Sequence, residues 1–116
     1  MLSRLFDLRN LPAALPIPAR LDGMRCLDIG TFDGFWALEM ERRGASEVVA
    51  VDLLDRTSWD WPVGSRPEVI DAIAQRKAEG SGFELTRAAL GSAVQRRELS
   101  VYSLDPADIG QFDFIY

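Results

Sequence analysis

The sequence has 116 residues, which allows one domain of ordinary size. Its net charge of −5 disfavours binding to nucleic-acid phosphates and to anionic membrane surfaces. The hydrophobic fraction of 47% argues against a disordered chain. The absence of histidine excludes Ser-His-Asp and Cys-His catalysis within this chain and removes the commonest zinc ligand, so we expect no metal site. With one cysteine and no apolar run long enough to span a membrane, we expect a cytoplasmic protein.

The first twenty residues are predicted to be a lead-in segment, followed by one domain over residues 21–116. Leucines and Phe6 within residues 2–9 favour a short helix. Three prolines, Pro12, Pro16 and Pro18, then predict an extended connector over residues 11–19 because proline disfavours helix in the residue before it.

A strand–helix–strand unit follows the lead-in. Residues 25–29 form a short apolar run between two glycines, which predicts a strand. Residues 35–43 are good helix formers, and Gly44 is a typical helix stop. Residues 47–51 include three valines in a nearly continuous apolar run, as in a strand buried on both faces, and the run ends at Asp52. Short links between these elements predict a parallel sheet with a right-handed crossover.

The second half of the chain is predicted in the same way. Residues 53–66 are an irregular loop whose Trp59 and Trp61 either line an acceptor pocket or cover the sheet edge. A helix is predicted over residues 67–79, and residues 83–90 fit a short helix or a strand. Further strands are predicted over residues 98–103 and 112–116. The last run leaves an open apolar edge, from which we expect the chain to be the N-terminal part of a larger domain, or to pair with a second copy there.

The residues that carry chemistry lie where the first two predicted strands end. In a parallel α/β sheet, ligands bind at the carboxyl ends of the strands. Gly30 allows a sharp turn after the first strand, and Gly34 brings the next helix close to the sheet. Asp52 follows the neighbouring strand and has two oxygens that can accept hydrogen bonds from vicinal ribose hydroxyls. The unit therefore predicts a nucleoside-binding crevice.

The loop does not fit the common phosphate-binding motifs. A dinucleotide fingerprint would need glycines where Phe32 and Phe35 stand, and a P-loop would need a lysine that is absent. The acidic Asp28 and Asp33 flank the loop. They would repel a phosphate but suit a ligand that carries an ammonium and a sulfonium group.

The stretch LDIGTFDGFW, followed by VVAVD, resembles the first motifs of the class I S-adenosylmethionine-dependent methyltransferases. The later stretch LSVYSLDPADIGQFDFIY resembles their third and fourth strands. The resemblance is nearest to uncharacterised members related to tRNA wobble-uridine modification enzymes. It implies a seven-stranded sheet of which this chain is the first half, and S-adenosylmethionine as cofactor.

The resemblance also implies roles for individual residues. The loop after the first strand would hold the methionine part of the cofactor, with an aromatic residue in place of the usual glycine. Asp52, followed by Leu53, would hold the ribose hydroxyls. Ser103, where many relatives have aspartate, and Leu104 would contact adenine. The loop residues in question are Asp28, Gly30, Thr31, Phe32, Asp33 and Gly34.

We therefore expect an α/β, Rossmann-like three-layer sandwich with a parallel sheet of order 3-2-1-4, and S-adenosylmethionine-dependent methyl transfer to an unidentified acceptor. No catalytic residue is identified. Two alternatives stay open. One is a fragment of a nicotinamide-dependent oxidoreductase, and the other is a non-catalytic module that pairs through its fourth strand.

Overall fold

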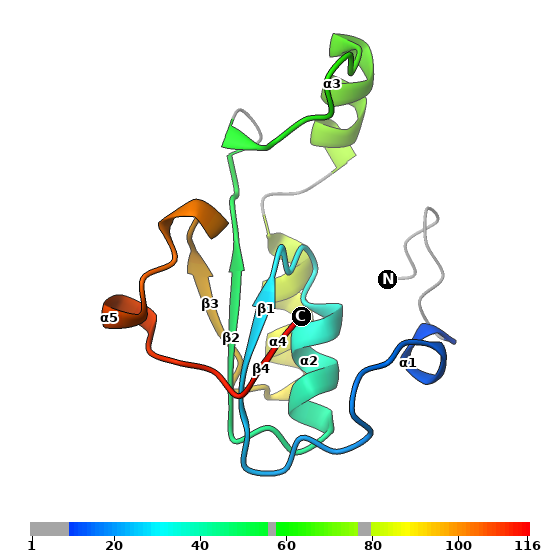
Figure 1. Ribbon diagram of the computed structural model, residues 1–116. Helices are drawn as coiled ribbons and strands as arrows, with labels where there is room; N and C mark the ends of the chain where they lie inside the picture. The colour runs from blue at the N-terminus through cyan, green and yellow to red at the C-terminus, as the bar shows by residue number, and fades with distance from the viewer. Residues whose placement is uncertain (1–9, 56–57, 77–79) are drawn as a thin grey trace.

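The computed structural model describes residues 10–55, 58–76 and 80–116. Its centre is a four-stranded, all-parallel sheet in the order β3-β2-β1-β4 (Figure 1). The strands are β1 (Arg25–Ile29), β2 (Glu47–Asp52), β3 (Gln95–Glu98) and β4 (Phe114–Ile115). The predicted α/β, Rossmann-like fold and the strand order 3-2-1-4 are confirmed.

Strand β2 lies inside the sheet, and its side chains are buried on both faces. Val48 and Ala50 belong to one core, while Val49 and Val51 belong to the other. All four are at most 3% exposed. Because side chains alternate between faces along a strand, a continuous apolar run is needed where both faces are covered.

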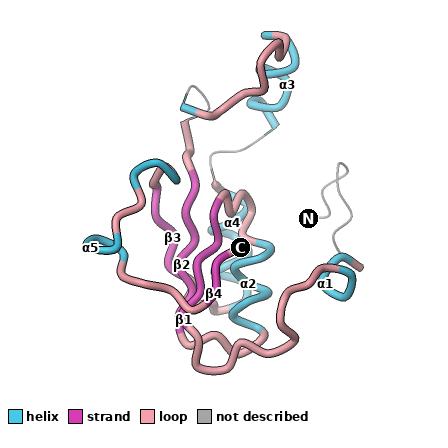
Figure 2. The backbone as a smooth tube through the Cα atoms, in the orientation of Figure 1, coloured by secondary structure: helices cyan, strands magenta, loops and turns pink. Residues whose placement is uncertain are grey.

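Helices cover the two faces unequally (Figures 1 and 2). On one face, α2 (Phe35–Arg42) and α4 (Ser81–Leu90) supply Ala37, Met40 and Phe83 to the core. On the other face, the four-residue helix α5 (Pro106–Ile109) supplies Ile109. Three layers result. None of the helices in the described parts of the chain is long and apolar enough to cross a bilayer.

The lead-in differs in part from its prediction. Residues 11–14 form the short helix α1 (Leu11–Ala14), with a proline in its first turn where the missing amide hydrogen costs nothing. The expectation of an extended segment over all of residues 11–19 was therefore wrong for its first four residues. The helix expected over residues 2–9 lies outside the described residues.

The helices of the second half agree with their prediction in type. Helix α3 (Pro67–Arg76) begins where expected and extends away from the carboxyl edge of the sheet (Figure 1). The last three residues of its predicted range lie outside the described residues. The stretch that fitted either a helix or a strand is the helix α4, which ends at the left-handed Gly91.

The third strand was predicted in the wrong place. It occupies Gln95–Glu98, whereas residues 98–103 were expected, and Val101–Ser103 form a short 3-10 helix, η2. The predicted strand followed the apolar alternation from Leu99 to Tyr102. In the described sheet β3 is an edge strand, where charged side chains are tolerated and blunt the open edge.

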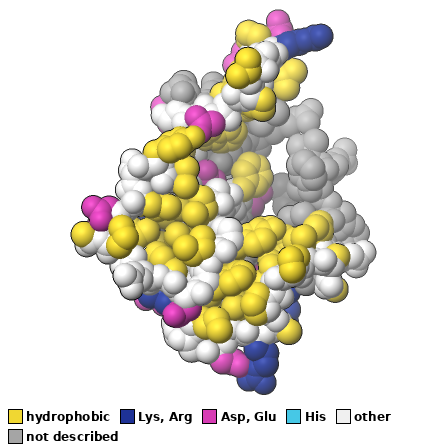
Figure 3. Space-filling model, viewed as in Figure 1, with side chains coloured by type: hydrophobic (Ala, Val, Ile, Leu, Met, Phe, Trp, Pro, Cys, Tyr) yellow, Lys and Arg dark blue, Asp and Glu magenta, His cyan; other side chains and the backbone are white. Residues whose placement is uncertain are grey.

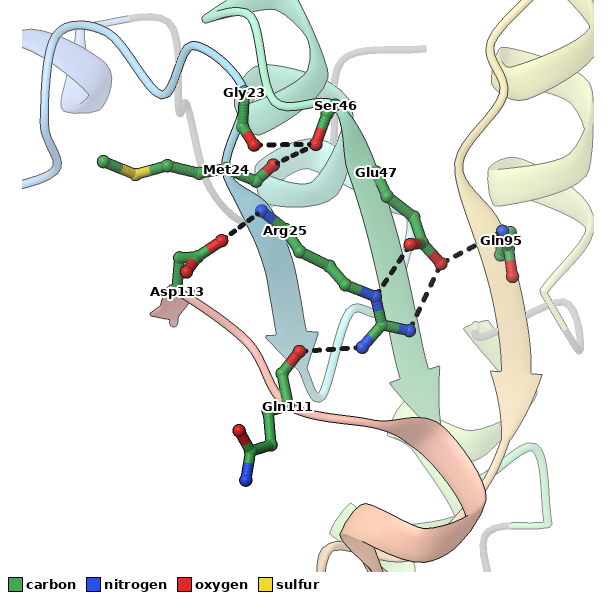
Figure 4. A network of polar contacts seen from close by, with 8 residues as sticks. All are labelled: Gly23, Met24, Arg25, Ser46, Glu47, Gln95, Gln111 and Asp113. Atoms are coloured by element: carbon green, nitrogen blue, oxygen red, sulfur yellow. Dashed lines mark hydrogen bonds and ion pairs between the residues drawn. The ribbon is translucent and has the colours of Figure 1, made fainter.

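At the amino ends of the strands, a polar network joins β1 to the segment that leads into β4 (Figure 4). The Arg25 guanidinium binds Glu47 with two hydrogen bonds and donates a third to the Gln111 carbonyl, 2.9 Å away. The Arg25 amide donates to the Asp113 carboxylate, and the Asp113 amide donates to the Arg25 carbonyl. These contacts fix the register of the two-residue strand β4 on β1.

Candidate functional site

A cavity of about 320 Å³ lies at the carboxyl ends of β1, β2 and β3. Its volume is at the lower end of the range for ligand pockets, and its position is where ligands bind in parallel α/β sheets. Residues from three separate segments line it. They are Ile29, Gly30, Phe32, Val51, Asp52, Leu53, Ser58, Trp59, Asp60, Leu99, Ser100, Val101 and Tyr102.

Asp52 is the central polar residue of this cavity. One of its carboxylate oxygens accepts a hydrogen bond from the Phe32 amide at 2.9 Å, and the other accepts from the Leu53 amide at 2.8 Å. Each carboxylate oxygen offers about two acceptor positions. The carboxylate therefore ties the loop after β1 to the end of β2.

Phe32 has an uncommon backbone conformation that the Asp52 bond helps to hold. Its φ angle is +52°, in the left-handed region that residues with a side chain rarely adopt. The ring is 45% exposed and contributes to the cavity wall. Strained residues of this kind cluster at ligand sites, where surrounding contacts hold them in place.

The two glycines of the loop differ in their surroundings. Gly30 has a φ of +73° and borders the cavity, and a β-carbon there would meet no other atom within 4 Å. Gly34 has a φ of +82°, and a β-carbon there would overlap the buried ring of Phe83. Gly34 is thus required for packing α4 beneath the loop, while Gly30 leaves open space beside the ligand cavity.

Asp28 lies beneath the loop and is 1% exposed. Its Oδ2 atom accepts a hydrogen bond from the Ala37 amide at 3.1 Å, in the first turn of α2. Burial raises the pKa of Asp28, the Ala37 hydrogen bond opposes this, and the negative charge of Asp52 adds to the rise. The hydroxyl of the buried Thr31 lies near this carboxylate but makes no hydrogen bond of good geometry within the described structure.

The predicted loop residues therefore separate into two groups. Gly30 and Phe32 line the cavity together with Asp52 and Leu53. Asp28, Thr31 and Gly34 are buried, and Asp33 lies against Gly82 in the first turn of α4. None of these last four residues lines the cavity. They shape the loop that the first group uses.

The residues predicted to contact adenine do not line the cavity either. Ser103 is exposed and ends η2, and Leu104 packs against the core beneath α5. Because β3 ends five residues earlier than predicted, the segment Leu99–Tyr102 lies at the cavity instead. The charged residues of β3 could have signalled an edge strand, but the apolar alternation after them was the stronger pattern.

The loop after β2 also contributes to the cavity, where the sequence had left open whether Trp59 and Trp61 line a pocket or cover the sheet edge. Ser58, Trp59 and Asp60 line the cavity. The Trp59 indole donates to the Leu53 carbonyl at 2.9 Å, and its ring lies 5.4 Å from that of Trp61. The tryptophan pair was the signal available. Trp59 forms part of the cavity wall, and Trp61 packs against it.

Charge at the cavity is entirely negative among the described lining residues. Asp52 and Asp60 contribute carboxylates, and no lysine or arginine in the described part of the chain lines it. A phosphate or pyrophosphate usually needs basic side chains or a free helix N-terminus. The cavity is therefore suited to a neutral or cationic ligand with hydroxyl groups to donate.

Comparison with known proteins gives little beyond the geometry. No family model matches the chain, and no curated protein matches it. Among solved structures, the chain is similar to a ribosomal protein L11 methylase from Lactobacillus delbrueckii subsp. bulgaricus, with a TM-score of 0.49 and 20% sequence identity. The similarity covers 91% of this chain and 40% of that protein, so the chain spans about two fifths of its length.

Proposed function

We propose that the chain binds S-adenosylmethionine in the cavity and supplies the cofactor-binding part of a methyltransferase. The observation that carries this proposal is the position of Asp52, whose carboxylate lines the cavity at the carboxyl end of β2 beside the open space at Gly30. A carboxylate at this place suits the two vicinal hydroxyls of a ribose. The resemblance of the loop sequence to the methyltransferase motifs supports the same ligand.

The charge of the cavity favours this ligand over a dinucleotide. S-adenosylmethionine has no phosphate, and its sulfonium and ammonium groups are cationic. When bound, it supplies a methyl group that an acceptor nucleophile attacks in line with the departing sulfur. This chain would contribute orientation of the ligand and an acidic, partly enclosed surrounding, because placement of reactants is a large part of such catalysis. The acceptor is left open.

Calorimetric titration with S-adenosylhomocysteine, the product form of the cofactor, tests the proposal. We expect saturable one-to-one binding, and we expect Asp52→Ala to weaken it by about 10- to 100-fold, the scale of lost hydrogen bonds to a charged group. Asp71→Ala is the matched control, because it removes the same charge from an exposed position on α3 that does not line the cavity.

Asp52→Asn separates ligand binding from support of the loop. The amide oxygen of asparagine can still accept from one backbone amide, so we expect a folded protein with intermediate affinity. Circular dichroism verifies that each variant is folded. If the wild-type chain binds NADH but not S-adenosylhomocysteine, or if Asp52→Ala binds as tightly as wild type, the proposal is wrong.

A further inference from the structure

An exposed tyrosine stands at the mouth of the cavity and is held there at both ends. Tyr102 is 81% exposed, although it lines the cavity. Its amide donates to the Ser100 hydroxyl oxygen, which caps η2, at 3.3 Å. Its phenol hydroxyl donates to Oδ2 of Asp60 at 2.6 Å. Hydrogen bonds to a carboxylate are shorter and stronger than neutral ones, so the ring has a defined position despite its exposure.

The bond joins two loops that are distant in sequence. Asp60 follows β2 and Tyr102 follows β3, and the two residues are 42 positions apart in the sequence. Trp59, next to Asp60, is anchored to the Leu53 carbonyl on the cavity wall. The two loops thus meet across the cavity and present two aromatic side chains, Trp59 and Tyr102, to the same space.

An exposed ring of fixed orientation at a cavity mouth is suited to a flat ligand group. Covering it removes apolar area from water, and the ring loses little freedom because it is already fixed. Stacking of a nucleobase on an aromatic side chain is favourable for any base and needs no positive charge. The absence of basic lining residues among those described agrees with a base rather than a phosphate at this place.

We infer that Tyr102 contacts the base of a bound nucleoside and that Asp60 is a positioning residue that holds the Tyr102 ring across the cavity mouth. The inference rests on the proposed function, because it assigns one part of the same ligand. It assigns base recognition to a pair of side chains from two loops, of which Asp60 lies outside the motifs that suggested the cofactor.

The test is a set of titrations with S-adenosylhomocysteine and with adenosine, which lacks the amino-acid part. Tyr102→Leu removes the ring, and we expect about tenfold weaker binding of both ligands, within the range measured for loss of a base-stacking side chain. Tyr102→Phe and Asp60→Ala each remove the hydrogen bond and keep the ring, and adenosine, which is uncharged, is the ligand that reports on the bond when the Asp60 charge is also lost. We expect each to weaken binding by about two- to fivefold, in line with the loss of a hydrogen bond.

Two further variants distinguish positioning from a general structural effect. The double variant Tyr102→Phe/Asp60→Ala is expected to bind no more weakly than either single variant, because all three lack the same bond. Asp60→Asn keeps an acceptor for the phenol and is expected to restore most of the affinity. Val63→Ala, at a fully exposed position of the same loop that does not line the cavity, is expected to bind like wild type.

The outcomes separate this inference from the proposed function. If wild type binds S-adenosylhomocysteine and Tyr102→Leu binds both ligands equally well, Tyr102 does not contact the base and the inference alone fails. Additive losses in the double variant, or no recovery in Asp60→Asn, would refute the positioning role of Asp60. If the folded wild type binds neither ligand, both the inference and the proposed function are wrong.

Discussion

Asp28 is the buried ionisable residue that connects the loop to α2. Burial raises its pKa from the ordinary value of 3.8, so the folded chain takes up a proton more readily than the unfolded chain. The free energy of unfolding therefore decreases as the pH rises from that ordinary value through the raised one. When Asp28 is ionised, its carboxylate is stabilised by the hydrogen bond that it accepts from the Ala37 amide at the start of α2.

We expect Asp28→Asn to unfold with a weaker dependence on pH than wild type as the pH rises above the ordinary aspartate pKa of 3.8. The asparagine oxygen can still accept from Ala37, its amide group can donate to the nearby Thr31 hydroxyl, and no charge is buried. Urea unfolding at a series of pH values measures this. Equal pH slopes for the two proteins would show that Asp28 does not have a raised pKa.

Gly30 and Gly34 allow a direct comparison between two single residues. Both have a positive φ, but only at Gly34 would a β-carbon overlap a neighbouring side chain. Gly34→Ala is expected to lower the free energy of unfolding by about 2–4 kcal/mol, from left-handed strain together with overlap on Phe83. Gly30→Ala meets open space, so we expect about 1–2 kcal/mol from strain alone. Chemical denaturation compares the two, and equal losses would contradict the packing role of Gly34.

At the scale of elements, Arg43 at the end of α2 forms a buried ion pair within the helix and ties the helix to the lead-in by hydrogen bonds. The Arg43 side chain is 7% exposed and binds Glu39, 11% exposed, at 2.8 Å. The same guanidinium donates to the Ile17 and Pro18 carbonyls, 2.9 Å from each. Hydrogen bonds from Arg42 and Arg43 lower the pKa of Glu39. Helix α2 therefore holds the connector in place as well as covering the sheet.

Arg43→Ala is expected to destabilise the chain by about 3 kcal/mol, because it leaves Glu39 partly buried and two carbonyls without their donor. Arg42→Ala is the control. Arg42 pairs with the same Glu39, but its side chain is 71% exposed, so we expect a much smaller loss. Thermal unfolding measures both. A loss in Arg42→Ala as large as in Arg43→Ala would show that burial of the pair is unimportant.

The elements also show which features the sequence predicts well. The unit from Arg25 to Asp52 was predicted closely, because apolar runs, glycine stops and a buried β-branched strand all indicate the same structure. Strand β3 was not, because its Gln95–Glu98 segment is polar and its strand character comes from pairing with β2. The candidate site divides in the same way. Gly30, Phe32, Asp52 and Leu53 line the cavity. Ser103 and Leu104 do not, because the third strand was predicted too late in the sequence.

At the scale of the whole molecule, the two edges of the sheet have different chemistry. The amino edge is closed by the Arg25 network and has paired charges. The carboxyl edge has the cavity, which the carboxylates of Asp52 and Asp60 line, in a chain of net charge −5. Hydrophobic side chains gather over β2 and β3 beside α5 (Figure 3). Parallel strands produce this polarity, because all their carboxyl ends lie on one side.

The hydrogen bonds of Asp52 to Phe32 and Leu53 have a thermodynamic consequence for any ligand at this carboxylate. These bonds fix the loop within the folded chain, so the ordering entropy of the loop is spent during folding. A ligand that binds Asp52 beside the Phe32 and Leu53 amides does not have to reorder the loop. Its affinity then depends mainly on its own contacts, as in a preorganised receptor, rather than on the cost of shaping the site.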